Sequence, residues 1–151
     1  MRIILTTVVR ASVSINDKLV GKINKGFLLL TGFTHGDNKE IVDKLIDKLL
    51  NLRVFPDENG KINLSLSDVN GEILSVSQFT LYANAKGSRR PSFTDALNPA
   101  EAEELYNYMN EVIENKYGKL STGVFGADMK VESVNDGPFT LILDSKELFN
   151  I

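Results

Sequence analysis

Residues 2–33, RIILTTVVRASVSINDKLVGKINKGFLLLTGF, predict that the chain begins with three consecutive β-strands. The turn Asn16-Asp17-Lys18 separates Arg2 to Ile15 from Leu19 to Ile23, an arrangement typical of a hairpin. The apolar run Phe27 to Phe33 that follows indicates a buried strand. The fold therefore starts from a sheet.

Two helices interrupt the strands, and each has a capping signal. Asn38 to Leu50 carries apolar residues at helical spacing, with Asp37 as the expected N-cap and Glu40 three residues later. Pro99 to Tyr117 follows Asn98, a good N-cap residue, and has proline at its first position. We therefore expect two main helices.

Most of the remaining chain is predicted as strands. Glu72 to Tyr82 forms one long strand, and Met129 to Val134 and Phe139 to Leu143 form a terminal pair. Strands outnumber helices and do not alternate with them, which predicts an α+β fold with a mainly antiparallel or mixed sheet or barrel. We expect a single domain over residues 1–151. The longest irregular segment, 83–98, is of the kind that is often functional.

The composition narrows the classes of function. The absence of cysteine excludes disulfides, zinc-thiolate sites and thiol nucleophiles. The most apolar stretch, Gly26 to Phe33, is far shorter than the roughly 20 residues that span a bilayer, so we expect a soluble, cytoplasmic protein with no membrane partner. A net charge of −3 argues against a non-specific nucleic-acid binder but leaves room for a small patch that grips one end of an RNA.

No residue pattern predicts a conventional catalytic centre. The single histidine, His35, precedes the first helix and is interpreted as a solvated turn residue, so we expect no Ser-His-Asp triad. No spacing of ligands indicates a metal site, and we expect no cofactor. An enzyme with this inventory works through backbone groups, hydroxyls, amides or the chemistry of its own substrate.

Three polar side chains stand out in Ser77-Gln78-Phe79-Thr80-Leu81, because their neighbours predict a strand buried on both faces. An unpaired buried polar group costs about 1–3 kcal/mol, so each of the three needs a partner. Two interpretations stay open at this point. The side chains pair within the core, or they line a polar pocket at a strand end, where backbone N–H groups meet a ligand.

The loop that follows is locally basic on an acidic protein. Lys86, Arg89 and Arg90 lie close together, with no acidic residue before Asp95. Lysine and arginine are the usual partners of phosphate groups, so this loop is a candidate anion site.

The segment Asn135 to Thr140 joins the two strands of the predicted terminal pair. Its glycine and proline indicate a turn. Gly137-Pro138 is also a possible cis peptide, a form found at about 5–6% of X-Pro bonds in folded proteins. The sequence leaves open whether the segment is a plain turn or one that contains a cis peptide.

Together these segments resemble the D-aminoacyl-tRNA deacylase family over essentially the whole chain. The Ser-Gln-Phe-Thr-Leu and Asn-x-Gly-Pro motifs, in this order, are highly specific. The resemblance also rests on Arg10-Ala11-Ser12-Val13, Asn51-Leu52-Arg53-Val54-Phe55, Asn63-Leu64-Ser65-Leu66, Arg90-Pro91-Ser92-Phe93-Thr94-Asp95 and Phe125-Gly126-Ala127-Asp128-Met129. One departure is Thr6-Thr7, where family members usually carry Gln-Arg, and it bears on fine specificity.

The resemblance implies a β-barrel-like domain that works as a homodimer on the aminoacylated 3′ end of tRNA. A cis Gly137-Pro138 of one subunit enters the pocket of the other, and its carbonyl oxygens hold the amino group of the substrate. Met129 packs nearby, and Lys86, Arg89 and Arg90 contact the tRNA. The terminal adenosine and the scissile ester are held, largely by main-chain N–H groups, at four residues expected to form the catalytic site, Ser77, Gln78, Phe79 and Thr80.

This arrangement also implies a mechanism of chiral selection. A D side chain points to open space and an L side chain points into the Gly-Pro backbone, so many D-amino acids, and glycine mischarged on tRNA(Ala), are accepted. The substrate's vicinal ribose hydroxyl assists the attack while N–H groups stabilise the oxyanion.

Two alternatives remain open. In the first, Thr80 is a covalent nucleophile, although no base stands beside it in the sequence. In the second, the protein is a non-enzymatic dimeric module that binds RNA or a metabolite.

Overall fold

Strand β1 (Arg2–Ile15) organises the sheet because other strands pair with it along both edges. In the computed structural model, which describes residues 1–151, the first half of β1 pairs antiparallel with β3 (Gly26–Gly32) and the second half with β2 (Lys18–Ile23). Its other edge pairs, also antiparallel, with β8 (Lys130–Asp144). The three strands predicted at the start of the chain are confirmed, and the last strand joins them.

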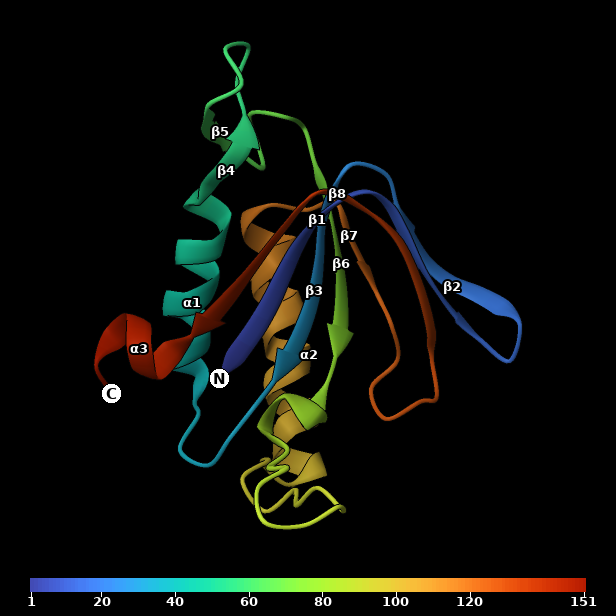
Figure 1. The fold of residues 1–151 in the computed structure, drawn as a ribbon, viewed down its shortest axis with the longest axis vertical. Coiled ribbons are helices and arrows are strands. Elements are labelled where there is room, and N and C mark those ends of the chain that lie inside the picture. The colour runs from blue at the N-terminus through green and yellow to red at the C-terminus, as the bar shows by residue number, and fades with distance from the viewer.

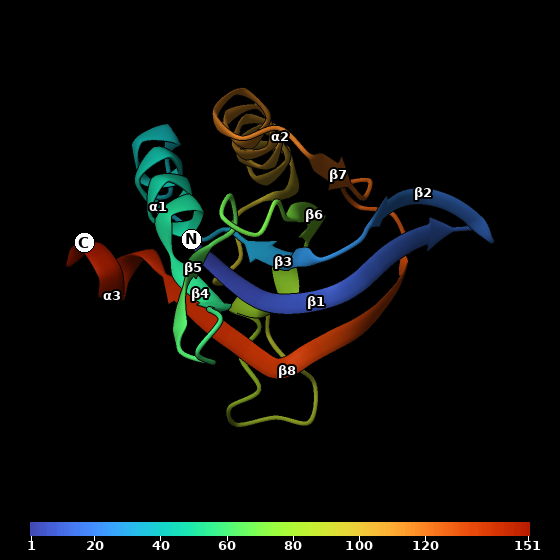
Figure 2. The ribbon, with the colours of Figure 1, turned by 90° about the horizontal axis from the view of Figure 1, so that it is seen from above.

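The sheet is mixed, because two further strands add to it in parallel. β6 (Glu72–Ser77) pairs parallel with β3, and β7 (Leu120–Thr122) pairs parallel with β6. β2 curls round toward β7 (Figure 2), and the Ser121 hydroxyl donates to the Lys22 carbonyl oxygen at 3.2 Å. The sheet is thus nearly closed and barrel-like, which confirms the predicted fold class.

Two helices, α1 (Lys39–Asn51) and α2 (Pro99–Lys116), lie together on one side of the sheet (Figure 1). Successive side chains of a strand point to opposite faces. Phe27 and Leu29 of β3 therefore share a core of 21 buried residues with the helices. Leu28, between them, points the other way into a second cluster of 7 buried residues from the curled strands. The expectation that this segment is a buried strand is confirmed.

Three short elements complete the fold. β4 (Arg53–Pro56) and β5 (Ile62–Ser65) form an antiparallel pair after α1. A third helix, α3 (Ser145–Phe149), follows β8 at the end of the chain and was not predicted. It lies beside α1 in Figure 1, and its residue Phe149 packs against the main core.

The predicted cap of α1 is wrong by one residue. Asn38, not Asp37, is the N-cap, and its side chain accepts from the Ile41 N–H at 3.0 Å. Asp37 is engaged elsewhere, by the Met1 ammonium group. The predicted cap of α2 is confirmed, since Asn98 accepts from the N–H of Glu101.

The strand predicted over Glu72 to Tyr82 is wrong in its second half. β6 ends at Ser77, and Phe79–Tyr82 form a short 3₁₀ turn, η1. The physical reason is the loss of a neighbour. The last residue pair between β3 and β6 is Thr31 with Ser77, and the Gln78 N–H makes one further bond, to the Thr31 carbonyl oxygen at 2.7 Å.

The predicted terminal pair is also wrong, because its two segments form one strand, β8, and both pair with β1. β1 is long enough, at 14 residues, to accept both. Between the two segments β8 bulges. From Thr6 to Val8 β1 advances by two positions, while β8 advances by five, from Thr140 back to Asn135. Gly137-Pro138 lies in this bulge, and its peptide bond is cis.

Candidate active site

A pocket of about 610 Å³ lies where β3 and β6 end, against the first turn of α2. The ends of the strands contribute Gly32 and Ser77, and α2 contributes Ala102. The rest of the wall comes from η1, from the segment that precedes α2 and from the segment that precedes β8. The larger apolar side chains in the lining are Phe33, Val76, Phe79, Phe93, Leu97, Phe125, Met129 and Val131.

A glycine at the end of β3 lets η1 approach the sheet closely. A Cβ atom at Gly32 would lie 2.8 Å from the Gln78 carbonyl oxygen and 3.1 Å from Leu81 Cβ. Because the nearest of these atoms is backbone, a larger residue at this position would displace η1 from the pocket wall.

The polar groups of the Ser-Gln-Phe-Thr segment lie at the pocket and not in the core. Ser77 and Gln78 are half-buried, whereas Phe79 and Thr80 are exposed. The Gln78 Nε2 donates to the Thr80 hydroxyl at 2.6 Å. The hydroxyl that is paired within the core belongs to Ser75, two residues earlier, and it donates to Asn110 Oδ1 at 2.8 Å. Of the two interpretations left open by the sequence, the structure favours the pocket.

The structure brings together some of the predicted site residues and separates others. Ser77, Gln78, Phe79 and Met129 line the pocket, and Thr80 lies beside Gln78. Gly137 and Pro138 are exposed in the bulge of β8 and do not line the pocket of their own chain. Thr7 donates its hydroxyl to the Asp136 carbonyl oxygen at 2.9 Å and so supports this bulge.

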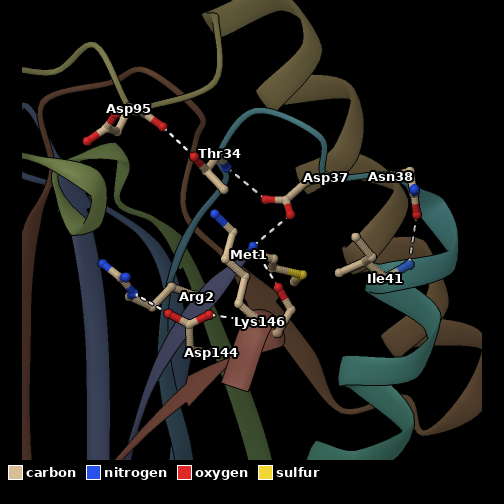
Figure 3. Close-up of polar contacts among 10 residues, drawn as sticks. Met1, Arg2, Thr34, Asp37, Asn38, Ile41, Asp95, Asp144 and Lys146 are labelled. Carbon is tan, nitrogen blue, oxygen red and sulfur yellow. Dashed lines mark hydrogen bonds and ion pairs between the residues drawn. The ribbon is translucent and has the colours of Figure 1, made fainter. Parts of the chain in front are cut away.

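A partly buried polar network ties the start of the chain to the pocket wall (Figure 3). The Met1 ammonium nitrogen lies 2.7 Å from Asp37 Oδ1 and 3.0 Å from the Ser145 hydroxyl. Burial lowers the pKa of this ammonium group from 8.0, although the hydrogen bond to Asp37 acts in the opposite direction. Asp37 Oδ2 accepts from the Thr34 N–H at 2.7 Å, and the Thr34 hydroxyl donates to the Asp95 carbonyl oxygen at 2.5 Å. The pocket-lining segment 93–97 is held through this network.

Arg2 makes a second link, to η1. Its Nε donates to Asp144 Oδ2 at 2.9 Å, and its Nη1 donates to the Leu81 carbonyl oxygen at 2.7 Å. Burial alone would raise the pKa of Asp144, but the hydrogen bonds from Arg2 and from the Lys146 N–H lower it below 3.8. The guanidinium carbon also lies 4.5 Å from the centroid of the Tyr82 ring.

The basic loop is pinned at its base and open at its tip. Asn84 and Ser92 exchange two backbone hydrogen bonds, of 2.7 and 2.8 Å, and so close the segment between them. Lys86, Arg89 and Arg90 are exposed on this segment and form no ion pair within the chain. Their side chains are therefore available to an external anion.

The histidine is exposed, in agreement with its interpretation as a solvated turn residue. His35 Nε2 donates to the Thr94 carbonyl oxygen at 2.7 Å, so the imidazole supports the loop before α2. No group of three or more His, Asp or Glu side chains is arranged to hold a metal ion. None of the helices has the length and apolar character that crossing a membrane requires.

Phe93 and Phe125 line the pocket, although the sequence pattern does not predict them as pocket residues. Both lie in segments that carry the family resemblance, and this was the only signal for them. Their place in the lining depends on contacts between distant parts of the chain, which a periodic pattern does not contain.

Comparison with known proteins gives a consistent result. A family model described as "D-Tyr-tRNA(Tyr) deacylase" matches residues 4–144. Among curated relatives, a D-aminoacyl-tRNA deacylase of Lactobacillus gasseri is 54% identical over 95% of this chain and 99% of its own. A D-aminoacyl-tRNA deacylase of Thermosipho melanesiensis is 49% identical over 99% of this chain and 100% of its own.

Two solved structures are also similar. One, "c-Myc DNA Unwinding Element Binding Protein", is 37% identical and has a TM-score of 0.89 over 95% of this chain and 98% of its own. The other, described as a probable eukaryotic D-amino acid tRNA deacylase, is 19% identical with a TM-score of 0.81, over 94% of this chain and 97% of its own, and shows that the fold is shared.

Proposed function

Since the chain belongs to the D-Tyr-tRNA(Tyr) deacylase family, we propose that it hydrolyses the ester that joins a D-amino acid to tRNA. Water is consumed, and the free D-amino acid and tRNA are released. The observation that carries the proposal is the pocket, which the family motif Ser77-Gln78-Phe79 lines at the ends of two strands. Residues 1–151 then form one deacylase domain, which acts in the cytoplasm, where its tRNA substrate is used.

The pocket suits the terminal adenosine of tRNA. Its volume of about 610 Å³ lies within the range of sites for small ligands. Phe79, Phe93 and Phe125 provide aromatic surface on which a base stacks. Ser77 and Gln78 add polar groups at the strand end, where the ester is expected. Lys86, Arg89 and Arg90 contact phosphates further along the tRNA.

The proposed active unit is a homodimer. Val134 and Ile142 of β8 are exposed, the latter by 66%, and exposed apolar side chains of this kind are buried when subunits associate. The Gly137-Pro138 bulge lies on the same strand and is free to enter the pocket of a partner. Its carbonyl oxygens would hold the substrate's amino group and leave room for a D side chain but not an L side chain. Glycine is then accepted as well.

The chemistry relies on the substrate and the main chain. The ribose hydroxyl next to the ester assists the attack, and N–H groups near Phe79 and Thr80 stabilise the developing oxyanion. Thr80 as a nucleophile would need a base. The Gln78 amide donates a hydrogen bond to the Thr80 hydroxyl, and an amide of this kind does not accept the hydroxyl proton. This contact supports the mechanism without a covalent intermediate.

The test is hydrolysis of D- and L-tyrosyl-tRNA by the purified protein at equal concentrations. We expect rapid release of D-tyrosine, very slow release of L-tyrosine and measurable hydrolysis of glycyl-tRNA. Binding without hydrolysis would support a non-enzymatic binding module. Similar rates for the two enantiomers would contradict the proposed steric selection.

A further inference from the structure

The side chain of Arg2 connects one end of the β1–β8 pair to the pocket wall. Arg2 is the first residue of β1, and its partner Asp144 is the last residue of β8. Its hydrogen bond to the Leu81 carbonyl oxygen, at 2.7 Å, and its contact with the Tyr82 ring both reach the last two residues of η1. Arg2 therefore contacts the turn that presents Phe79 and Thr80, although it does not line the pocket.

Few backbone hydrogen bonds hold this turn in place. Its closing hydrogen bonds, from the Leu81 N–H to Gln78 and from the Ala83 N–H to Thr80, measure 3.2 and 3.0 Å. A 3₁₀ turn has poorer hydrogen-bond geometry than an α-helix, and this one has no adjacent strand to pair with. The Tyr82 hydroxyl is buried without a partner, so packing and the guanidinium group hold its ring.

Arginine is suited to this task because its guanidinium group is planar and donates in several fixed directions. The Nε atom donates to the Asp144 carboxylate and so fixes the orientation of the guanidinium plane. The Nη1 atom donates to the Leu81 carbonyl oxygen. A lysine ammonium group at the same position would retain the charge but not this fixed fork. The turn is thus held against the rigid end of the sheet.

We propose that Arg2 is a positioning residue for the ester hydrolysis. It fixes η1 so that Phe79 and Thr80 keep the geometry that the reaction and the rejection of L-amino acids require. Rejection by a steric clash needs walls that do not yield, so a mobile η1 lowers selectivity as well as rate. This inference rests on the proposed function.

The experiment compares Arg2→Met and Arg2→Lys with the wild type and with Arg53→Met. Arg53 is a matched control because its Nε also donates to a backbone carbonyl oxygen, that of Asn63 at 2.9 Å, outside the pocket. For each protein, kcat/KM is measured with D- and L-tyrosyl-tRNA at a temperature where circular dichroism shows full folding. Mass spectrometry follows amide hydrogen exchange in residues 78–83.

We expect Arg2→Met to lower kcat/KM for the D substrate about tenfold and the D/L ratio about fivefold, with faster exchange in 78–83. Arg2→Lys should be intermediate and Arg53→Met unchanged. Because the D/L ratio does not depend on the fraction of active molecules, a lower rate with an unchanged ratio indicates a merely structural role and overturns the inference.

Two further outcomes are decisive. If Arg2→Met does not fold, Arg2→Lys decides by the same ratio. If the wild type hydrolyses neither substrate, the proposed function fails, and the exchange measurement still tests whether Arg2 holds η1 in place. Unchanged exchange in residues 78–83 of the Arg2 variants overturns the inference.

Discussion

The rings of Phe79 and Phe93 meet edge to face with their centroids 5.2 Å apart, one from η1 and the other from the loop before α2. Both residues line the pocket, yet they remain 53% and 45% exposed. Aromatic side chains bury a large area when they find a partner. A base stacked here would cover surface that the protein itself leaves open, which makes this pair a natural place to test ligand binding.

Replacing Phe93 with alanine should weaken binding of the substrate's 3′ end. Stacking of a base on an aromatic side chain contributes about 1–3 kcal/mol, so we expect KM for D-tyrosyl-tRNA to rise roughly tenfold. Val124→Ala is the control, because Val124 is exposed but lies outside the pocket. Equal KM values for the two variants would place the base elsewhere.

Thr80→Val should reduce the rate of hydrolysis by roughly tenfold at most. The variant removes only the hydroxyl that accepts from Gln78, and loss of one such hydrogen bond costs about 0.5–1.5 kcal/mol. Thr80→Ser, which keeps the hydroxyl, should be close to the wild type. A substrate that lacks the terminal 2′-hydroxyl should react far more slowly than either variant reacts with normal substrate. If Thr80→Val is inactive and the wild type hydrolyses the 2′-deoxy substrate at the normal rate, Thr80 is the nucleophile.

Reversing the charges of Lys86, Arg89 and Arg90 should weaken tRNA binding and flatten its dependence on salt. Each phosphate contact contributes about 0.7–0.9 to the magnitude of the slope of log affinity against log salt, so loss of all three contacts should reduce that magnitude by about 2 to 3. The control reverses Lys39, Lys44 and Lys48 on α1. If only the α1 variant changes the slope in a titration, the RNA lies over that helix.

The proposed shared site predicts complementation between two inactive chains. One chain carries Gly137→Val, which alters the bulge, and the other carries Phe79→Ala with Phe93→Ala, which alters the pocket. Differently tagged chains are co-expressed and the heterodimer is purified. One of its two sites is then intact, so it should recover about half of the wild-type activity while both homodimers stay impaired. A heterodimer as impaired as the homodimers would place each site within one chain.

The Arg2–Asp144 pair should make the free energy of unfolding decrease at low pH. The pKa of Asp144 is lowered in the folded protein, so its contribution is complete above the unfolded value, about 4, and is lost as pH falls through the folded value. Asp144→Asn should cost about 2 kcal/mol at neutral pH and flatten the curve below pH 4. Urea unfolding at several pH values measures this free energy. The control is Glu40→Gln, which removes the exposed ion pair between Glu40 and Lys44. Parallel curves for Asp144→Asn and the wild type would contradict the assignment.

Local patterns predicted the regular elements well. Both helices follow from apolar spacing and capping residues, and the ends of α2 are right to within one residue. At the start of α1 two adjacent residues are able to cap. Which of them does so is decided by the Met1 ammonium group, which engages Asp37 and lies 36 residues away in the sequence.

What the patterns missed depends on distant partners. β6 stops at Ser77 because its pairing with β3 ends there, and the apolar character of Leu81 and Tyr82 gives no sign of this. β8 remains one strand because β1 offers it an edge throughout. The role proposed for Gly137-Pro138 requires a second copy of the chain, and neither residue lines the pocket of its own chain.

The pairing of β1 with β8 joins residues that are 142 positions apart, and it has a consequence for biosynthesis. At about 5–20 residues per second, translation of the 142 residues that separate them takes roughly seven to thirty seconds. During that time one edge of the first strand has no partner, and an open edge invites pairing with other chains. The nascent chain therefore leaves this edge of β1 unpaired until β8 has been synthesised. A chain whose synthesis stops before β8 would keep this edge of β1 unpaired and would be prone to aggregation.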